Sequence, residues 1–194
     1  MQNLHQTILL HSCCGPCSTT ALERLAQTYR VTVFYYNPNI LPEAEYAHRL
    51  AEQERLIKIL QEAGTPVDLI AGAYEPDVYF EAVKGLENEP EGGARCAKCF
   101  ELRLRQTARV AVQRGISTFC TTLTVSPHKN AEVINRIGLA LAADFPTLTY
   151  LPTNFKKQEG YKRSLELSRQ YGIYRQNYCG CPFAMGHLSK LKQP

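Results

Sequence analysis

The segment TILLHSCCGPCSTTALERL, residues 7–25, decides how this chain is expected to fold. It opens with a short apolar run, as a buried strand does, and it closes with a pattern that is typical of a helix. Between the two, the loop HSCCGPCS carries a Cys-Gly-Pro-Cys dithiol with a third cysteine directly before it. The cysteines therefore stand where a strand passes into a helix, a place at which α/β proteins commonly bind their ligands.

Apolar runs recur along the rest of the chain. Each is short, rich in β-branched or aromatic residues and bounded by turn residues, as buried strands are. Helical patterns occupy the intervals between them, so we expect an α/β fold, namely a Rossmann-like layer sandwich with a mostly parallel sheet. The expected strands span residues 7–10, 31–36, 67–71, 118–123 and 148–151.

Two helices are predicted most clearly. The first begins after Pro42, carries Tyr46 on its apolar stripe and ends at Gly64, so Tyr46 is expected in the core. The second runs from about residue 96 to residue 114. Between these helices, Asp77 is expected to be a helix N-cap rather than a metal ligand.

The chain has 194 residues, of which 44% are hydrophobic, and this is enough for one domain with a sizeable core. We expect a single α/β domain over residues 1–194, with an irregular C-terminal segment from about residue 172. The N-terminal residues lack the features of a signal peptide, and no stretch approaches the roughly 18 apolar residues of a spanning helix. We therefore expect a cytoplasmic protein without membrane association, in which closely spaced cysteines more often bind metal or react than form structural disulfides.

Seven of the eight cysteines fall into three tight clusters. Spacings of one to three residues allow thiolates from a single turn to reach one metal ion or cluster. The eighth, Cys120, lies inside an apolar run and is expected to be an ordinary buried residue. The clusters are Cys13 with Cys14 and Cys17, Cys96 with Cys99, and Cys179 with Cys181.

Three functions compete for these clusters. A thioredoxin-like oxidoreductase would use Cys14 and Cys17 at the start of a helix, but it would leave five clustered thiols without a role. Structural zinc would need four thiolates from distant segments, whereas zinc sites are usually more local in sequence. An iron–sulfur cluster assembled from three loops at the mouth of an α/β sheet uses the pattern most fully.

Five motifs in order resemble the QueH-type epoxyqueuosine reductases: HSCCGPCS, EPEGGARCAKCFELRL, TTLTVSPHKN, FKKQEGYKRS and YRQNYCGC. The resemblance covers residues 8–183 and implies two-electron removal of the epoxide oxygen from epoxyqueuosine at the tRNA wobble position, which gives queuosine and water. It also implies a fold similar to that of the adenine nucleotide α-hydrolases, whose phosphate loop corresponds to residues 12–18. Pro16 removes a backbone N–H that a phosphate cradle would use, so the loop is expected to hold metal.

The same resemblance implies a [4Fe-4S] cluster and an unidentified low-potential electron donor. Because seven thiolates exceed the four that such a cluster takes, we expect a cluster with incomplete cysteine ligation, and beside it a second metal ion (iron or zinc) or a redox-active cysteine pair that forms a disulfide. Proximity to the motifs makes His11, Tyr178 and His128 the candidate proton donors. The expected cofactor ligands are Cys13, Cys14, Cys96, Cys99, Cys179 and Cys181, and Cys17 completes the metal-binding set.

Basic residues mark the surface expected to bind tRNA. The net charge of +4 is only a weak indication, but in the C-terminal third the basic residues alternate with tyrosines. Cationic side chains next to planar rings suit an unstacked loop nucleotide held among phosphates. The predicted nucleic-acid-binding residues are Lys98, Arg105, Arg109, Lys156, Lys157, Arg163 and Arg175.

Overall fold

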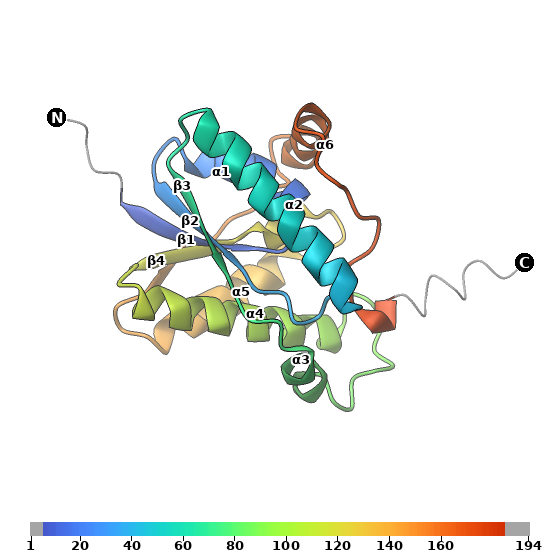
Figure 1. Ribbon diagram of the computed structural model, residues 1–194. Helices are drawn as coiled ribbons and strands as arrows, with labels where there is room; N and C mark the ends of the chain where they lie inside the picture. Colours follow the sequence, from blue (N-terminus) through green and yellow to red (C-terminus); the bar gives the residue numbers. More distant parts are fainter. Residues whose placement is uncertain (1–5, 185–194) are drawn as a thin grey trace, which may run out of the picture.

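The computed structural model describes residues 6–184, and within them one parallel sheet forms the centre of the molecule (Figure 1). The strand order is β3-β2-β1-β4-β5, and every neighbouring pair is parallel, which confirms the expected α/β layer fold. The strands are β1 (Thr7–Ser12), β2 (Arg30–Tyr35), β3 (Val67–Ala71), β4 (Thr118–Thr121) and β5 (Thr149–Tyr150).

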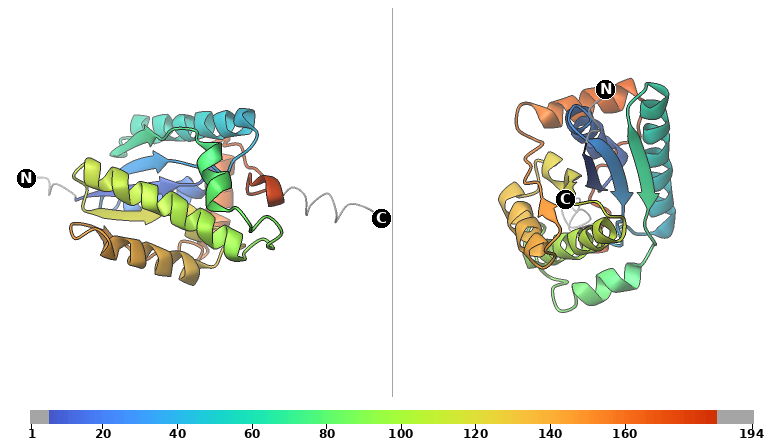
Figure 2. Two further views of the ribbon diagram at one scale, coloured as in Figure 1. Left: turned by 90° about the horizontal axis from the view of Figure 1, so that it is seen from below. Right: turned by 90° about the vertical axis from the view of Figure 1, so that its left-hand side faces the viewer.

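Helices cover both faces of this sheet. α1, α2 and α6 pack together on one face, and α4 and α5 pack together on the other, as Figure 1 and the two views of Figure 2 show. The short α3 contacts α4. The bounds are α1 (Gly15–Leu25), α2 (Glu43–Glu62), α3 (Pro76–Ala82), α4 (Ala94–Gln113), the 3-10 helix η1 (Thr122–Val125), α5 (Ala131–Ala143) and α6 (Gly160–Gln170).

The core lies in two layers because successive strand side chains point to opposite faces. Ile8 and Leu10 of β1 pack beneath α1 and α2, whereas Leu9 packs with Ala108 of α4 on the opposite face. Tyr46 is buried as expected. Both clearly predicted helices are present, as α2 and α4.

Two local expectations were wrong. The strand expected over residues 118–123 ends at Thr121, because the Thr121 side chain accepts a hydrogen bond from the Leu123 backbone and caps η1. Asp77 is not the N-cap of α3, since that position is Glu75 and the helix already begins at Pro76, whose fixed φ suits a first helical turn. Asp77 instead places its carboxylate in that turn, where it interacts favourably with the positive end of the helix dipole.

Parallel strands end at one edge of the sheet, and this edge gathers the cysteine loops. β1 leads directly to Cys13, and β4 leads directly to η1. After Gly172 the chain runs without a strand or helix back to the start of α2, where the Leu41 N–H donates to the Gly180 carbonyl. None of the helices in the described part of the chain is long and apolar enough to cross a membrane.

A candidate metal centre built from seven cysteines

Cys13, Cys14 and Cys17 form one compact set, called here the three-thiol group. Their sulfur atoms all lie within 4.8 Å of one another, and the Sγ atoms of Cys13 and Cys14 are 3.7 Å apart. Cys14 is the N-cap of α1 and has an extended backbone, while Pro16 occupies the first turn of the helix. The turn from β1 into α1 therefore brings the three thiols together.

Hydrogen bonds among the three thiols shift their pKa values in different directions. Cys13 accepts from Cys14 and Cys17, which holds the pKa of Cys13 well below its usual value. Donating to Cys13 raises the pKa of Cys14 to about 11 and also raises the pKa of Cys17. The Thr122 hydroxyl donates to the same Cys13 sulfur at 3.3 Å. The group thus favours a single thiolate, on Cys13, when no metal is bound.

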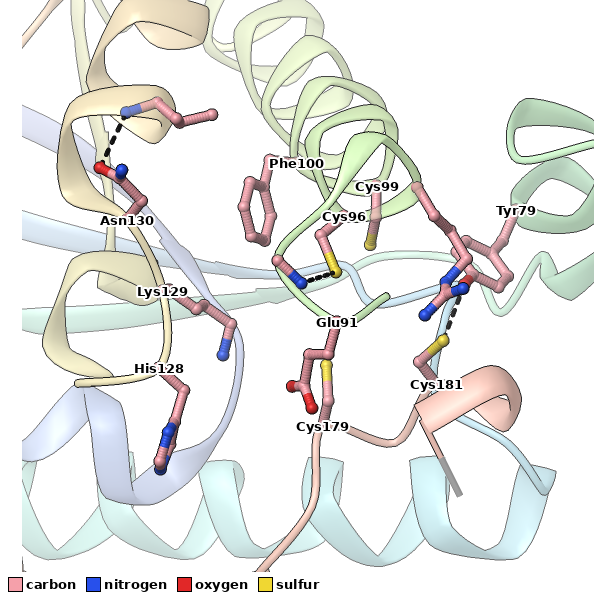
Figure 3. A pocket seen from close by; sticks show the side chains of 13 residues that line it. Tyr79, Glu91, Cys96, Cys99, Phe100, His128, Lys129, Asn130, Cys179 and Cys181 are labelled. Carbon is pink, nitrogen blue, oxygen red and sulfur yellow. Dashed lines mark hydrogen bonds between the residues drawn. The ribbon is translucent and has the colours of Figure 1, made fainter. Parts of the chain in front are cut away.

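Cys96, Cys99, Cys179 and Cys181 line a second, smaller cavity of about 100 Å³ and are called here the four-thiol group. Figure 3 shows one pair entering from the start of α4 and the other from the C-terminal segment. Gly180 has a φ of +96°, which suits glycine, and this turn brings both cysteines of the C-x-C motif to the cavity.

Neighbouring groups hold the sulfurs of the four-thiol group in place. The Gly92 N–H lies 3.2 Å from the Cys96 sulfur, and the Tyr79 hydroxyl lies 2.9 Å from the Cys181 sulfur (Figure 3). Burial raises the pKa of Cys99 to about 12 and also raises that of Cys96. These thiols therefore need a metal or another compensating charge to ionise.

The two groups line neighbouring cavities that share lining residues. A larger cavity of about 570 Å³ is lined by the whole three-thiol group and by Cys179, which also lines the smaller cavity. Glu91, His128 and Lys129 line both cavities as well. Burial lowers the pKa of Lys129, but the thiols of Cys179, Cys13 and Cys17 outweigh burial, so the net shift is upward.

Three buried arginines surround the cysteines. Arg49 donates to the backbone carbonyls of Tyr178 and Cys179, and Arg95 donates to carbonyls of the loop before α4. Arg49 also forms an ion pair with Glu45 at 2.7 Å. Arg103 donates to the Asn37 side chain, and among the described residues no carboxylate forms an ion pair with it. A buried cation without an anionic partner is unfavourable, so this arrangement suits anionic thiolates or a negatively charged cluster nearby.

The candidate proton donors differ in position. His128 lines both cavities, and Tyr178 lines the larger one, where its ring lies 4.9 Å from the Arg49 guanidinium carbon. His11 lines neither cavity, since its ring nitrogens lie 2.8 Å from the Thr121 hydroxyl and 3.2 Å from the Tyr36 carbonyl. Burial, assisted by the charge of Arg103, lowers the pKa of His11 to about 3.

The basic residues expected to bind tRNA differ in their exposure and in their ion pairs. Arg175 lines the larger cavity, whereas Lys98 and Arg105 form ion pairs with Glu101. Arg163 pairs with Glu23 at 2.7 Å. Lys156 donates to a backbone carbonyl, while Arg109 and Lys157 are exposed.

Sequence reasoning missed several residues of this site, among them Lys129, Arg103 and Asn39. Arg103 follows Cys99 by four residues on a predicted helix, and that spacing would have placed both on one face. Lys129 lies within the motif TTLTVSPHKN, but the sequence analysis assigned it no function. Asn39 follows β2 in a loop without any distinctive pattern, so only the structure reveals that it lines the larger cavity.

All eight cysteines lie within the described residues, and all are free thiols. The redox-active pair considered from the sequence is therefore not joined as a disulfide in this structure. What the site offers is a set of seven thiols in two neighbouring groups, with buried cations around them.

Comparisons with known proteins agree with this arrangement. The family model described as epoxyqueuosine reductase QueH matches residues 8–187. Similar proteins include the epoxyqueuosine reductase QueH of Streptococcus pyogenes serotype M1, which is 45% identical over 94% of this chain and 72% of its own length. That of Staphylococcus epidermidis is 44% identical over 91% and 75%, and that of Thermotoga maritima is 35% identical over 92% and 90%. The chain therefore belongs to the epoxyqueuosine reductase QueH family.

Proposed function

We propose that this chain reduces epoxyqueuosine in tRNA to queuosine, using a [4Fe-4S] cluster and a second metal ion held by its seven clustered thiols. Membership of the family and the names of the curated relatives support the reaction. The observation that carries the metal assignment is that two thiol groups, one of three and one of four, border two cavities that share Cys179 in their lining. The substrate is a tRNA, so the proposal includes a cytoplasmic location.

The two groups suit different occupants. Four sulfurs around a single tetrahedral ion, with bonds of about 2.3 Å, would be about 3.8 Å apart. The Sγ atoms of Cys13 and Cys14 are 3.7 Å apart, so the three-thiol group fits one ion with its fourth position open to substrate. The four-thiol group offers the four thiolates that a [4Fe-4S] cluster takes. Arg103 and Lys129 would offset the negative charge of both centres.

The reaction breaks both C–O bonds of the epoxide, forms a C=C bond and releases water, and it consumes two electrons and two protons. When bound, the metal groups supply a Lewis acid for the oxygen and a path for electrons from a low-potential donor. The chain itself supplies protons from the Nζ ammonium of Lys129 and the imidazole of His128, both of which border the thiol groups. The Tyr178 hydroxyl in the same cavity is the third candidate donor.

Two other functions are less well supported. A thiol–disulfide exchanger would need only Cys14 and Cys17 and would leave the four-thiol group unused. A zinc-binding scaffold would not need a cavity of about 570 Å³ beside its metal. The curated relatives carry the name of a reductase, which favours the main proposal over both.

The test is anaerobic reconstitution followed by turnover of epoxyqueuosine-bearing tRNA with a low-potential reductant. We expect at least four irons per chain with acid-labile sulfide, and we expect Cys96→Ser and Cys179→Ser each to abolish most turnover and to lower iron content. Stoichiometric zinc without sulfide would contradict the cluster. Full turnover in both serine variants would contradict the proposal that the four-thiol group takes part in the reaction.

A further inference from the structure

Glu91 is the only carboxylate among the described residues that line the two cavities, and it lines both of them. Within residues 6–184 its carboxylate forms no hydrogen bond and no ion pair. Figure 3 shows the Glu91 side chain pointing from the loop before α4 into the smaller cavity. Its negative charge is therefore free to pair with a ligand.

The loop that carries Glu91 is fixed by the residues that follow it. Gly92 has a φ of +89°, which suits glycine, and its N–H lies 3.2 Å from the Cys96 sulfur. Arg95, in the first turn of α4, donates to backbone carbonyls of the same loop. The backbone of Glu91 is thus held beside the four-thiol group, although its side chain is exposed.

The other side chains of these cavities that carry a full charge near neutral pH are basic residues and thiolates. When a metal is bound, the thiolates are its ligands and their negative charge is compensated by the metal. Glu91 is then the anionic side chain in the described lining with which a cationic ligand group can pair. The basic lining residues are Arg49, Arg95, Arg103, His128, Lys129 and Arg175.

Epoxyqueuosine carries a cationic group of this kind. Its epoxide-bearing ring is joined to the 7-deazaguanine through a methylene group and a secondary amine, and an alkylamine is protonated near neutral pH, as the lysine side chain is. The ammonium lies between the base and the epoxide. An anion that binds the ammonium therefore also positions the epoxide.

We propose that the Glu91 carboxylate binds the secondary ammonium of epoxyqueuosine and thereby selects a wobble nucleoside with a cationic side chain over unmodified guanosine. This inference rests on the proposed function, because it concerns the substrate of that reaction. Glu91 belongs to the lining of both cavities, and the three-thiol group lines the larger one, so the ring beyond the ammonium can extend toward these thiols. A charge-assisted hydrogen bond that the bound substrate covers from water is stronger than an exposed ion pair.

The experiment measures binding of anaerobically reconstituted protein to three anticodon stem-loop RNAs that differ only in the wobble base. The base is guanine, 7-aminomethyl-7-deazaguanine or 7-cyano-7-deazaguanine, so only the second carries a cation and none contains an epoxide. Phosphate contacts are the same in all three RNAs and cancel in the ratio of affinities. We expect the wild-type protein to bind the aminomethyl RNA about tenfold more tightly than the cyano RNA.

Glu91→Gln keeps the shape of the side chain but removes its charge, so it should reduce this preference to less than about twofold. Glu91→Asp keeps the charge and should retain part of the preference. Glu87→Gln changes another exposed carboxylate of the same loop, outside both cavities, and as the matched control it should keep the wild-type preference. Iron per chain should equal the wild-type value in all three variants, because the proposal makes Glu91 a substrate contact and not a metal ligand.

Equal affinity of the wild-type protein for the aminomethyl and cyano RNAs would overturn the inference. An unchanged preference in Glu91→Gln would overturn it as well, and so would loss of iron from folded Glu91→Gln, which would make Glu91 a metal ligand. Turnover of epoxyqueuosine by the wild-type protein is measured separately. Turnover without the preference contradicts this inference alone, whereas the preference without turnover contradicts the proposed reaction alone.

Discussion

Nη1 of Arg103 lies 3.9 Å from the sulfur of Cys99, one turn earlier on α4, and both side chains are buried. The second terminal nitrogen of Arg103 donates to Asn37, and its Nε has no partner among the described residues. The fold therefore fixes a positive charge beside the four-thiol group, and within residues 6–184 no carboxylate forms an ion pair with it. Such a charge stabilises thiolate ligands and a reduced, more negative cluster.

Replacing this charge should change the metal centre itself. We expect Arg103→Leu to lower the iron retained per chain and to shift the reduction potential of the remaining cluster to more negative values, with Arg103→Lys intermediate. Iron analysis and an anaerobic redox titration measure the two effects without reference to turnover. Arg109→Leu removes an exposed arginine of the same helix and is the matched control. Unchanged iron content and an unchanged reduction potential in Arg103→Leu would contradict a role of the Arg103 charge in the metal centre.

The extent to which the sequence revealed this site follows from the range of the interactions involved. Strand and helix periodicity are local, so the alternating pattern was sufficient for the parallel sheet and for α2 and α4. Cysteine clustering is also local, and it identified all seven thiols. The sequence could not divide them into groups of three and four, because that division depends on where the segment after Gly172 returns to the sheet edge.

Buried cations were the other feature that the sequence concealed. Arg49, Arg95 and Arg103 lie in helical stretches where arginine is usually exposed, and only tertiary packing shows that each has its guanidinium in the interior. The expected tRNA surface shows the opposite case, in which a basic residue expected to be available for tRNA is paired within the fold. Arg163 belongs to a basic stretch, yet in the folded chain its charge is paired with Glu23 and Glu166.

His11 should contribute to the pH dependence of stability. Burial, with the charge of Arg103, lowers its pKa from 6.5 to about 3, so the unfolded chain binds more protons than the folded chain between these values. Stability is therefore present above pH 6.5 and is lost as the pH falls toward 3, by at most about 1.4 kcal/mol per pH unit from this group.

The measurement is urea unfolding of the wild type and of His11→Asn at pH 7, 6 and 5. Other groups titrate in both proteins, so the difference between them isolates His11. We expect the free energy of unfolding to fall more steeply with decreasing pH in the wild type than in the variant. Parallel curves would mean that the imidazole is already protonated inside the fold or remains accessible to water.

Cys120 provides a test of the division between structural and metal-binding cysteines. Its side chain is fully buried in β4 and packs in the core beneath α1 with Leu10 and Val125. Cys120→Ser places a hydroxyl among apolar groups and should lower the free energy of unfolding by about 1–3 kcal/mol, while iron content stays at the wild-type value. Denaturant unfolding and iron analysis of the same preparation decide this. An iron loss that equals the unfolded fraction of the chain would fit the expectation. Loss of iron from fully folded protein would contradict it.

Salt dependence should distinguish the basic residues that contact tRNA from those already paired within the fold. Lys157 is exposed beside α6, whereas Arg163 forms ion pairs of 2.7 Å with Glu23 and 3.2 Å with Glu166. A lysine that contacts a phosphate releases counterions, so Lys157→Gln should weaken tRNA binding and reduce the slope of log affinity against log salt by about 0.7 to 0.9. Arg163→Gln should change that slope much less, because its partners must be broken before it can reach a phosphate.

Lys156 tests the same distinction at the adjacent position. Its Nζ donates to the Lys129 carbonyl at 2.6 Å, so its removal should disturb the placement of Lys129 between the thiol groups rather than the phosphate contacts. We expect Lys156→Gln to lower turnover on saturating stem-loop RNA while the salt slope stays close to that of the wild type, and Lys157→Gln to show the reverse. Binding titrations over a series of salt concentrations, paired with turnover at saturation, measure both quantities. If the two lysine variants lose the same salt slope and keep the same turnover, Lys156 is a phosphate contact and its bond to the Lys129 carbonyl has no functional role.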